Sequence, residues 1–173
     1  MPWQQKNLAT VQKWVEEVKG GGSPWLYCGG AVGSGKTHLC TAACGVLLNS
    51  GKAVRYMLWS DEARMLKALV NDEDEYYRKI EPLKTCDVLY IDDLFKVQRG
   101  DQQGRITPAD IRLAFELIDA RYRNDRITII SCEWLMDELL GLDEGVSSRI
   151  YERSRGYRVQ IAREAGRNMR LAM

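Results

Sequence analysis

The sequence predicts one α/β domain in which helices lie on both faces of a mostly parallel sheet. Five short apolar segments of strand type recur along the chain, helical segments separate them, and a glycine-rich turn follows the first strand. Strands that alternate with helices favour a parallel sheet, because two parallel strands need a crossover connection between them. The length of 173 residues suits a single domain, and the hydrophobic content of 45% allows a sizeable core.

The first half of the chain contains two of the expected strands. Its elements, in order, are a helix over 7–19, a strand over 25–28, a helix over 36–49, a strand over 53–59 and helical character from 60 to about 80. Ser60 is the expected N-cap of the last helix, because its hydroxyl can accept a hydrogen bond from the first helical turn. Pro82 is expected to end that helix, since proline lacks the backbone N–H. The pattern also allows an earlier break at Asn71 and Asp72.

The second half contains the other three strands. Its elements, in order, are a strand over 88–91, a polar loop over 94–107, a helix over 108–123, a strand over 126–131, short helices over 133–140 and 144–154, and a strand over 157–161. The strand over 88–91 is apolar throughout, which is expected when helices cover both faces of a parallel sheet. The alternating pattern of 157–161 favours a place at the edge of the sheet.

The composition gives no global sign of a nucleic-acid or membrane partner, since the net charge is +1. Residues 149–173 carry seven arginines against two glutamates, but charge alone favours a solvated surface there. The five cysteines form no C-x-x-C pair and the chain has one histidine, so a metal site of these residues is not expected. Cysteines in apolar runs favour reduced thiols and a cytoplasmic protein. No signal-peptide pattern and no apolar run long enough to span a bilayer is found.

Residues 30–37, GAVGSGKT, fit the phosphate-loop pattern G-x-x-x-x-G-K-[ST] in full. The motif lies between an expected strand and an expected helix, where backbone N–H groups and the helix N-terminus can bind phosphate oxygens. Lys36 is expected to reach the β- and γ-phosphates of a nucleoside triphosphate, and Thr37 to bind Mg²⁺. A glycine-rich turn that binds nothing is the disfavoured alternative, because pattern and context agree. The candidate cofactor-binding residues are Gly30, Gly33, Ser34, Gly35, Lys36, Thr37 and His38.

Two carboxylates, Asp92 and Asp93, follow the apolar strand at 88–91. In phosphate-loop enzymes a strand beside the loop delivers an aspartate to the magnesium shell, and Asp92 is the candidate for that role. Asp93 would orient or polarise the attacking water, which makes it a candidate catalytic residue together with Lys36. Alone, the pair would be better explained as an ordinary turn, but the phosphate loop upstream favours the functional interpretation.

Four segments in a fixed order carry a resemblance to a known family. They are GAVGSGKTHL at 30–39, DVLYIDDL at 87–94, RITIISCE at 126–133 and DEGVSSRIYE at 143–152. The chain resembles the AAA+ ATPase domain of bacterial replicative helicase loaders of the DnaC/DnaI type, including prophage versions and the related IstB-like transposition helpers. The resemblance implies a P-loop NTPase fold of the AAA+/ASCE type with a five-stranded sheet. It suggests an N-terminal helix and linker over 1–24 and the ATPase domain over 25–173.

The resemblance also implies an activity and partners. The chain would bind ATP and Mg²⁺, hydrolyse ATP slowly, assemble into an ATP-dependent homo-oligomer, and help to load the replicative DNA helicase onto single-stranded DNA at replication initiation, as in a primosome. Arg149 matches the arginine finger of such ATPases and would act as a catalytic residue on a neighbouring subunit's nucleotide; the alternative is an intrachain ion pair. Two other functions stay open: an IstB-like transposition helper and, less favoured, a small nucleotide kinase.

Some positions depart from the family's pattern. Glu133 aligns with the sensor 1 position, where a neutral polar residue is usual, and a carboxylate there would repel a γ-phosphate unless Mg²⁺ or a basic residue intervenes. Either Ser131 therefore senses the nucleotide or Glu133 points elsewhere. Residues 162–173 are too few for the usual helical lid, so no separate C-terminal lid domain is expected. Arg167 or Arg170 could still approach the nucleotide.

The resemblance places single-stranded DNA against residues 60–84. That segment holds Arg64, Lys67, Tyr76, Tyr77, Arg78, Lys79 and Lys84. Basic groups can follow a nucleic-acid backbone and aromatic rings can stack on bases. The acidic run at 71–75 would repel phosphates, so an amphipathic helix pair with its tyrosines in the core is an equal alternative.

Overall fold

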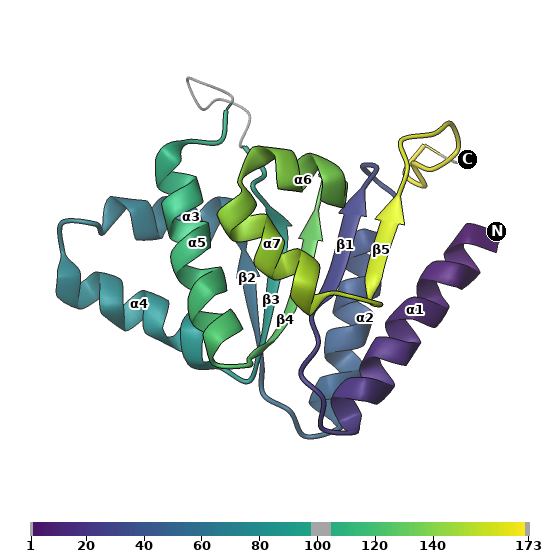
Figure 1. Cartoon of the computed structure of the whole chain (residues 1–173), viewed down its shortest axis with the longest axis horizontal. Helices are drawn as coiled ribbons and strands as arrows, with labels where there is room; N and C mark the ends of the chain where they lie inside the picture. The colour runs from purple at the N-terminus through teal and green to yellow at the C-terminus, as the bar shows by residue number, and fades with distance from the viewer. Residues whose placement is uncertain (1, 98–104, 172–173) are drawn as a thin grey trace.

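A parallel sheet forms the middle layer of the computed structural model, which describes residues 2–97 and 105–171 (Figure 1). Within these residues the sheet has five strands in the order β2-β3-β4-β1-β5, and the neighbouring strands pair in parallel. The strands are β1 (Leu26–Gly30), β2 (Val54–Leu58), β3 (Val88–Leu94), β4 (Ile127–Cys132) and β5 (Arg158–Ile161). The expected α/β class and the edge position of the last strand are both confirmed.

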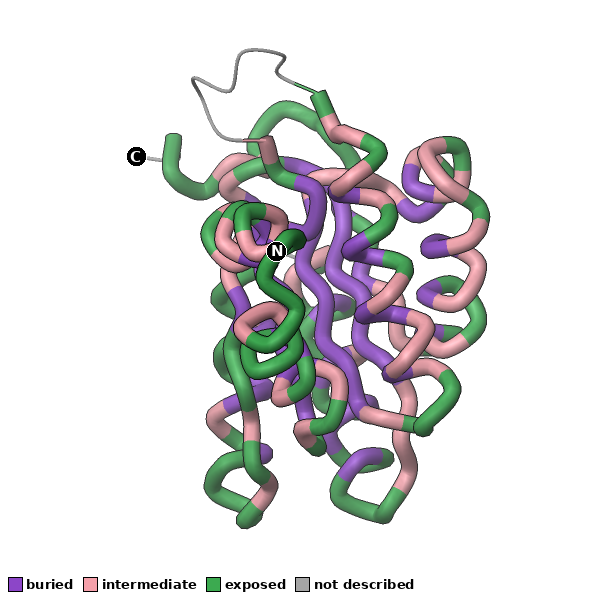
Figure 2. Tube along the Cα trace, turned by 90° about the vertical axis from the view of Figure 1, so that its left-hand side faces the viewer, coloured by how far each residue is buried: buried purple, intermediate pink, exposed green. Residues whose placement is uncertain are grey.

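Helices cover both faces of the sheet. The helices are α1 (Pro2–Lys19), α2 (Lys36–Asn49), α3 (Trp59–Ala68), α4 (Glu73–Thr85), α5 (Pro108–Arg123), α6 (Met136–Leu142) and α7 (Glu144–Arg153). The first two pack on one face in one hydrophobic cluster, and α3 to α7 pack on the other face in a second cluster. Figure 2 shows the strands as a buried layer between helices that are exposed on their outer sides.

Alternating side chains along each strand supply the two clusters. On β1, Tyr27 points into the cluster of α3 to α7, whereas Leu26 and Cys28 point into the cluster of α1 and α2. Leu89 and Tyr90 on β3 divide in the same way. Burial of each leucine among them stabilises the fold by about 1.5–3 kcal/mol. Because both strands are central, both faces must be apolar, which explains their unbroken hydrophobic character.

The helical stretch after β2 differs from the expectation at both ends. The strand runs directly into α3, whose N-cap is Leu58, so the expected cap at Ser60 is wrong. Pro82 lies inside α4 rather than ending it. The turn beyond the proline is stabilised from outside the helix, since the Arg121 guanidinium donates hydrogen bonds to the carbonyls of Leu83 (2.7 Å) and Lys84 (3.3 Å).

The break that the sequence allowed between the two helices is confirmed. The gap lies between α3 and α4, and Asp72 is the N-cap of α4. Its carboxylate accepts a hydrogen bond from the Glu75 N–H at 3.1 Å. The acidic run after Asn71 therefore serves a local purpose, because negative charge at a helix N-terminus is stabilising.

Strand β3 is longer than the sequence indicated, and its additional residues include the acidic pair Asp92 and Asp93. It continues to Leu94, so Asp92 and Asp93 lie inside the strand and not after it. It is also not beside β1, because β4 lies between them. Asp93 has a φ of 56° and Phe95 one of 61°, so the chain turns sharply where the register of β3 with β4 shifts. Such positive φ values are uncommon outside glycine.

The cysteines agree with the expectation of reduced thiols. Four cysteines are buried, Cys86 is half-buried, and all five are free thiols. Among the helices that the structure describes, none combines the length and the apolar character that crossing a bilayer requires.

Candidate functional site

The phosphate loop connects β1 to α2 at the C-terminal edge of the sheet. Gly33 has a φ of 69° and Gly35, the N-cap of α2, one of 88°, values that glycine adopts without strain. The buried Lys36 folds back over this loop, and its Nζ donates to the carbonyls of Gly30 at 2.9 Å and Ala31 at 2.7 Å. Burial lowers the pKa of Lys36, although the nearby charges of Asp93 and Glu133 act in the opposite direction.

Asp92 is surrounded by hydroxyl groups. Its Oδ1 accepts from Tyr90 at 2.6 Å and Thr37 at 3.2 Å, and also from Ser131. Its Oδ2 accepts from the Tyr56 hydroxyl at 2.9 Å. Burial by itself would raise the pKa of Asp92, but the four hydroxyl donors outweigh it and lower the pKa below the ordinary value. The group is therefore held as a carboxylate at the N-terminus of α2.

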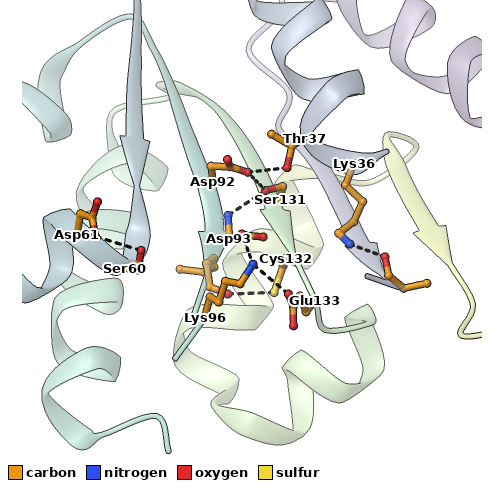
Figure 3. A network of polar contacts seen from close by, with 12 residues as sticks. Lys36, Thr37, Ser60, Asp61, Asp92, Asp93, Lys96, Ser131, Cys132 and Glu133 are labelled. Atoms are coloured by element: carbon orange, nitrogen blue, oxygen red, sulfur yellow. Dashed lines mark hydrogen bonds and ion pairs between the residues drawn. The ribbon is translucent and has the colours of Figure 1, made fainter. Parts of the chain in front are cut away.

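Asp93 belongs to a separate charged cluster that Figure 3 shows beside Asp92. The Lys96 ammonium lies 2.6 Å from Asp93 Oδ2 and 3.2 Å from Glu133 Oε1. The pKa of Lys96 is raised, because the two carboxylates outweigh its partial burial. Sequence reasoning did not include Lys96, although its place three residues after Asp93 could have indicated the pair. It also did not include the two tyrosines on Asp92.

The structure gives different surroundings to the two sensor candidates. The Ser131 hydroxyl donates to Asp92 and accepts from the Asp93 N–H at 2.9 Å, so it joins both acids of β3. Glu133 faces Lys96 instead. Lys96 is thus a basic residue beside Glu133, which occupies the expected sensor 1 position. A neighbouring basic residue is one of the conditions under which a carboxylate is expected to be tolerated close to a γ-phosphate.

Arg149 lies on α7, within the helices that cover one face of the sheet (Figure 1). Its guanidinium contacts Asp119 at 3.0 Å and the Gly145 carbonyl at 2.6 Å, and it stacks 4.8 Å from the centre of the Phe115 ring. The side chain remains 27% exposed. This is the intrachain ion pair that the sequence left as the alternative; action on a neighbouring subunit stays a proposal.

The C-terminal tail lies against the phosphate loop. The Met169 N–H donates to the Gly33 carbonyl at 2.9 Å. Arg167 pairs with Glu164 at 2.8 Å and stacks 4.8 Å from the Trp3 ring, so the tail also contacts α1. Arg170 instead lines a cavity of about 600 Å³ together with Val32, Lys96, Glu133 and Arg163. His38, the last candidate of the loop, is exposed.

Gly33 should tolerate no side chain. A Cβ built on it would lie 2.0 Å from Asn168 Oδ1, and its φ is positive. We expect Gly33→Ala to lower the melting temperature and to detach the tail, with about 1–2 kcal/mol of the loss due to the backbone alone. Thermal unfolding of Gly33→Ala and of Gly33→Ala/Asn168→Gly separates the two causes. Recovery in the double variant is expected to be partial; no recovery would contradict the contact with Asn168.

Comparison with protein-family models identifies the family of this chain. Residues 6–153 match the model of the IstB-like ATP binding protein family, which covers most of the chain. The chain belongs to this family. Two Bacillus subtilis (strain 168) relatives are each 35% identical: the uncharacterized protein YqaM over 148 residues and the phage-like element PBSX protein XkdC over 133 residues. This IstB-like chain spans 45% and 48% of their lengths, about half of each.

Solved structures agree with the family. The DnaC helicase loader superposes on 92% of this IstB-like chain and 90% of its own chain, with a TM-score of 0.75 and 25% identity. A primosome component from Streptococcus pyogenes covers 95% of this chain and 81% of its own, with a TM-score of 0.68 at 18% identity. The expected P-loop NTPase fold of the AAA+ type is confirmed.

In the IstB-like chain, several basic side chains of residues 60–84, the segment expected to face DNA, are paired with acidic side chains of the same chain. Lys67 contacts Asp110 at 2.5 Å, Arg78 contacts Glu75 at 2.7 Å, and Lys84 contacts Glu116 at 2.6 Å. The Tyr76 hydroxyl also donates to Glu116, at 2.6 Å, which fits the packing alternative. Tyr77, in contrast, is 57% exposed.

Proposed function

We propose that this chain binds ATP with Mg²⁺ and hydrolyses it. The observation that carries the proposal is the convergence of Lys36, Thr37 and Asp92, which come from the phosphate loop and from β3. The Thr37 hydroxyl lies 3.2 Å from Asp92 Oδ1. A hydroxyl beside a carboxylate offers the oxygen ligands that Mg²⁺ prefers, and the loop offers an ammonium and the N-terminus of a helix for phosphates.

Each residue has a role in this proposal. Lys36 would exchange its bonds to the Gly30 and Ala31 carbonyls for bonds to β- and γ-phosphate oxygens, which carry full charge. Thr37 and Asp92 would hold Mg²⁺, which neutralises charge that develops on the phosphates. Asp93 would orient the attacking water. Ser131 would keep the two aspartates in a fixed relation, since its hydroxyl contacts both.

At the level of the whole protein, we propose a role in loading a replicative helicase onto single-stranded DNA. The similarity to the DnaC helicase loader over 90% of that chain supports it. The matched family supports a second candidate, an ATP-dependent helper in transposition. The two differ in partner: a loader should bind a replicative helicase and single-stranded DNA, and a transposition helper should bind a transposase and duplex DNA.

The first experiment measures ATP hydrolysis by the purified protein without DNA, with single-stranded DNA and with duplex DNA, with its size in solution followed in parallel. Stimulation by single-stranded DNA together with ATP-dependent assembly is the expected result. Stimulation by duplex DNA alone would favour the transposition helper. A monomer that binds ATP and hydrolyses none in either case would contradict the proposed hydrolysis while leaving the binding site intact.

Arg149→Ala tests action on a neighbouring subunit. We expect ATP affinity to stay within about threefold of the unaltered chain and hydrolysis under assembly conditions to fall by about 10³. The matched control is Asp119→Ala, which removes the same intrachain ion pair, together with the Arg123–Asp119 pair on the surface of α5, and keeps the arginine at position 149. Steady-state hydrolysis and ATP titration are measured for both. Equal losses in the two variants would show that Arg149 acts only by holding α7 on α5.

A further inference from the structure

Lys96 bridges two carboxylates at the edge of the sheet where the phosphate loop lies. Its ammonium contacts Asp93, which comes from β3, and Glu133, which follows β4. A cavity of about 600 Å³ is lined by Lys96, Glu133 and Val32 of the phosphate loop. The charges of Asp93 and Glu133 also reach Lys36. The three charged groups therefore share the surroundings of the proposed γ-phosphate.

The position of Lys96 is set by the turn that ends β3. The Lys96 N–H donates to the Asp93 carbonyl at 2.9 Å, which closes the turn. Phe95, within this turn, has a φ of 61° and is buried against the Trp59 ring, with the ring centroids 5.4 Å apart. This anchor returns the Lys96 side chain toward Asp93. The lysine is thus placed by packing and not only by attraction.

The positive charge of Lys96 is needed when a triphosphate is bound beside Asp93 and Glu133. Glu133 and Asp93 would together bring two negative charges close to a bound triphosphate, and like charges at short range in a partly buried site repel strongly. Lys96 cancels one of them. Its contact of 2.6 Å with Asp93 Oδ2 also restrains the orientation of that carboxylate.

We propose that Lys96 is a positioning residue for Asp93 and the charge partner that permits a glutamate at position 133. This inference rests on the proposed ATP-binding function. In this proposal the Lys96 side chain has two effects. The net charge of the Lys96, Asp93 and Glu133 cluster sets the affinity for triphosphate, and the contact of Lys96 with Asp93 sets the rate of hydrolysis.

Four variants separate these effects: Lys96→Met, Glu133→Gln, the double variant and Lys96→Arg. The affinities for ATP and ADP and the kcat at saturating ATP are measured for each. Lys96→Met should weaken ATP binding roughly tenfold, and ADP binding less, because the γ-phosphate lies nearest. Glu133→Gln should tighten ATP binding. The double variant restores the net charge, so its ATP affinity should return to within about threefold of the unaltered chain.

The kcat is expected to follow a different order. The double variant should keep a kcat at least about tenfold below the unaltered chain, because Asp93 has lost its partner. Lys96→Arg should recover part of both quantities. Lys19→Met is the matched control, since it breaks a lysine–glutamate pair of 3.0 Å away from this cluster and should change neither quantity.

Three outcomes would count against these ideas in different ways. An unchanged ATP affinity in Lys96→Met would overturn the charge compensation. A kcat of the double variant equal to that of the unaltered chain would overturn the positioning role. Failure of the unaltered chain to bind ATP would overturn the proposed function and this inference with it.

Discussion

Lys36→Met is expected to weaken ATP binding about a hundredfold or more, since charge-assisted hydrogen bonds contribute about 1.5–3 kcal/mol each and the ammonium would make at least one to each of two phosphates. The fold should survive the change. Lys36 is buried, its partners are two carbonyls of its own loop, and methionine fills a similar volume. The measurement is a titration with ATP, with the melting temperature recorded on the same samples.

Lys19→Met is the control for the loss of one positive charge. Lys19 lies at the end of α1, is 41% exposed and pairs with Glu16 at 3.0 Å. Surface ion pairs contribute about 0–1 kcal/mol, so ATP affinity and melting temperature should both stay close to those of the unaltered chain. If Lys36→Met bound ATP as tightly as Lys19→Met does, the loop would not be the phosphate site.

Arg121→Met is expected to lower the free energy of unfolding by about 3–5 kcal/mol, because three buried oxygens lose their donor and each unsatisfied acceptor costs about 1–3 kcal/mol. The Arg121 side chain is fully buried between α4, α5 and β4. It donates to Leu83 O at 2.7 Å, Ile127 O at 2.6 Å and Thr128 Oγ1 at 2.9 Å. Methionine can satisfy none of these oxygens, and unsatisfied buried acceptors are costly.

The size of the loss is measured by urea unfolding at neutral pH. Burial lowers the pKa of Arg121 to about 10, so the guanidinium stays protonated under these conditions. Arg123→Met is the matched control, because Arg123 lies on the same helix and is 71% exposed. It should change stability by less than about 0.5 kcal/mol. Equal effects of the two substitutions would mean that Arg121 does not hold α4 to the sheet.

Features that depend on neighbouring residues in the sequence were predictable. Apolar runs bounded by glycine, proline and charged residues indicated the five strands, and the helical spacing indicated the helices between them, because side-chain periodicity reports which face is buried. The phosphate loop was also readable, since its glycines, Lys36 and Thr37 are contiguous. The functional interpretation of the acidic pair on β3 depended on the phosphate loop upstream.

Helix ends depended on distant residues. Pro82 reads as a helix end, yet α4 passes it because Arg121, nearly forty positions later, donates to the carbonyls of the final turn. Ser60 reads as a cap, yet α3 begins at Trp59 directly after β2. Local propensity is a weak prior that tertiary contacts override.

The sequence by itself determined the α/β class, the phosphate loop and the two aspartates, because each is a short-range pattern. Only the tertiary structure decided what surrounds them. It placed β4 between β1 and β3, brought Tyr56 to Asp92, and set Lys96 between Asp93 and Glu133. The order of strands in a sheet is a property of the whole chain. Residues that meet at the edge of a parallel sheet come from separate strands, so their distances cannot be read from spacing along the sequence.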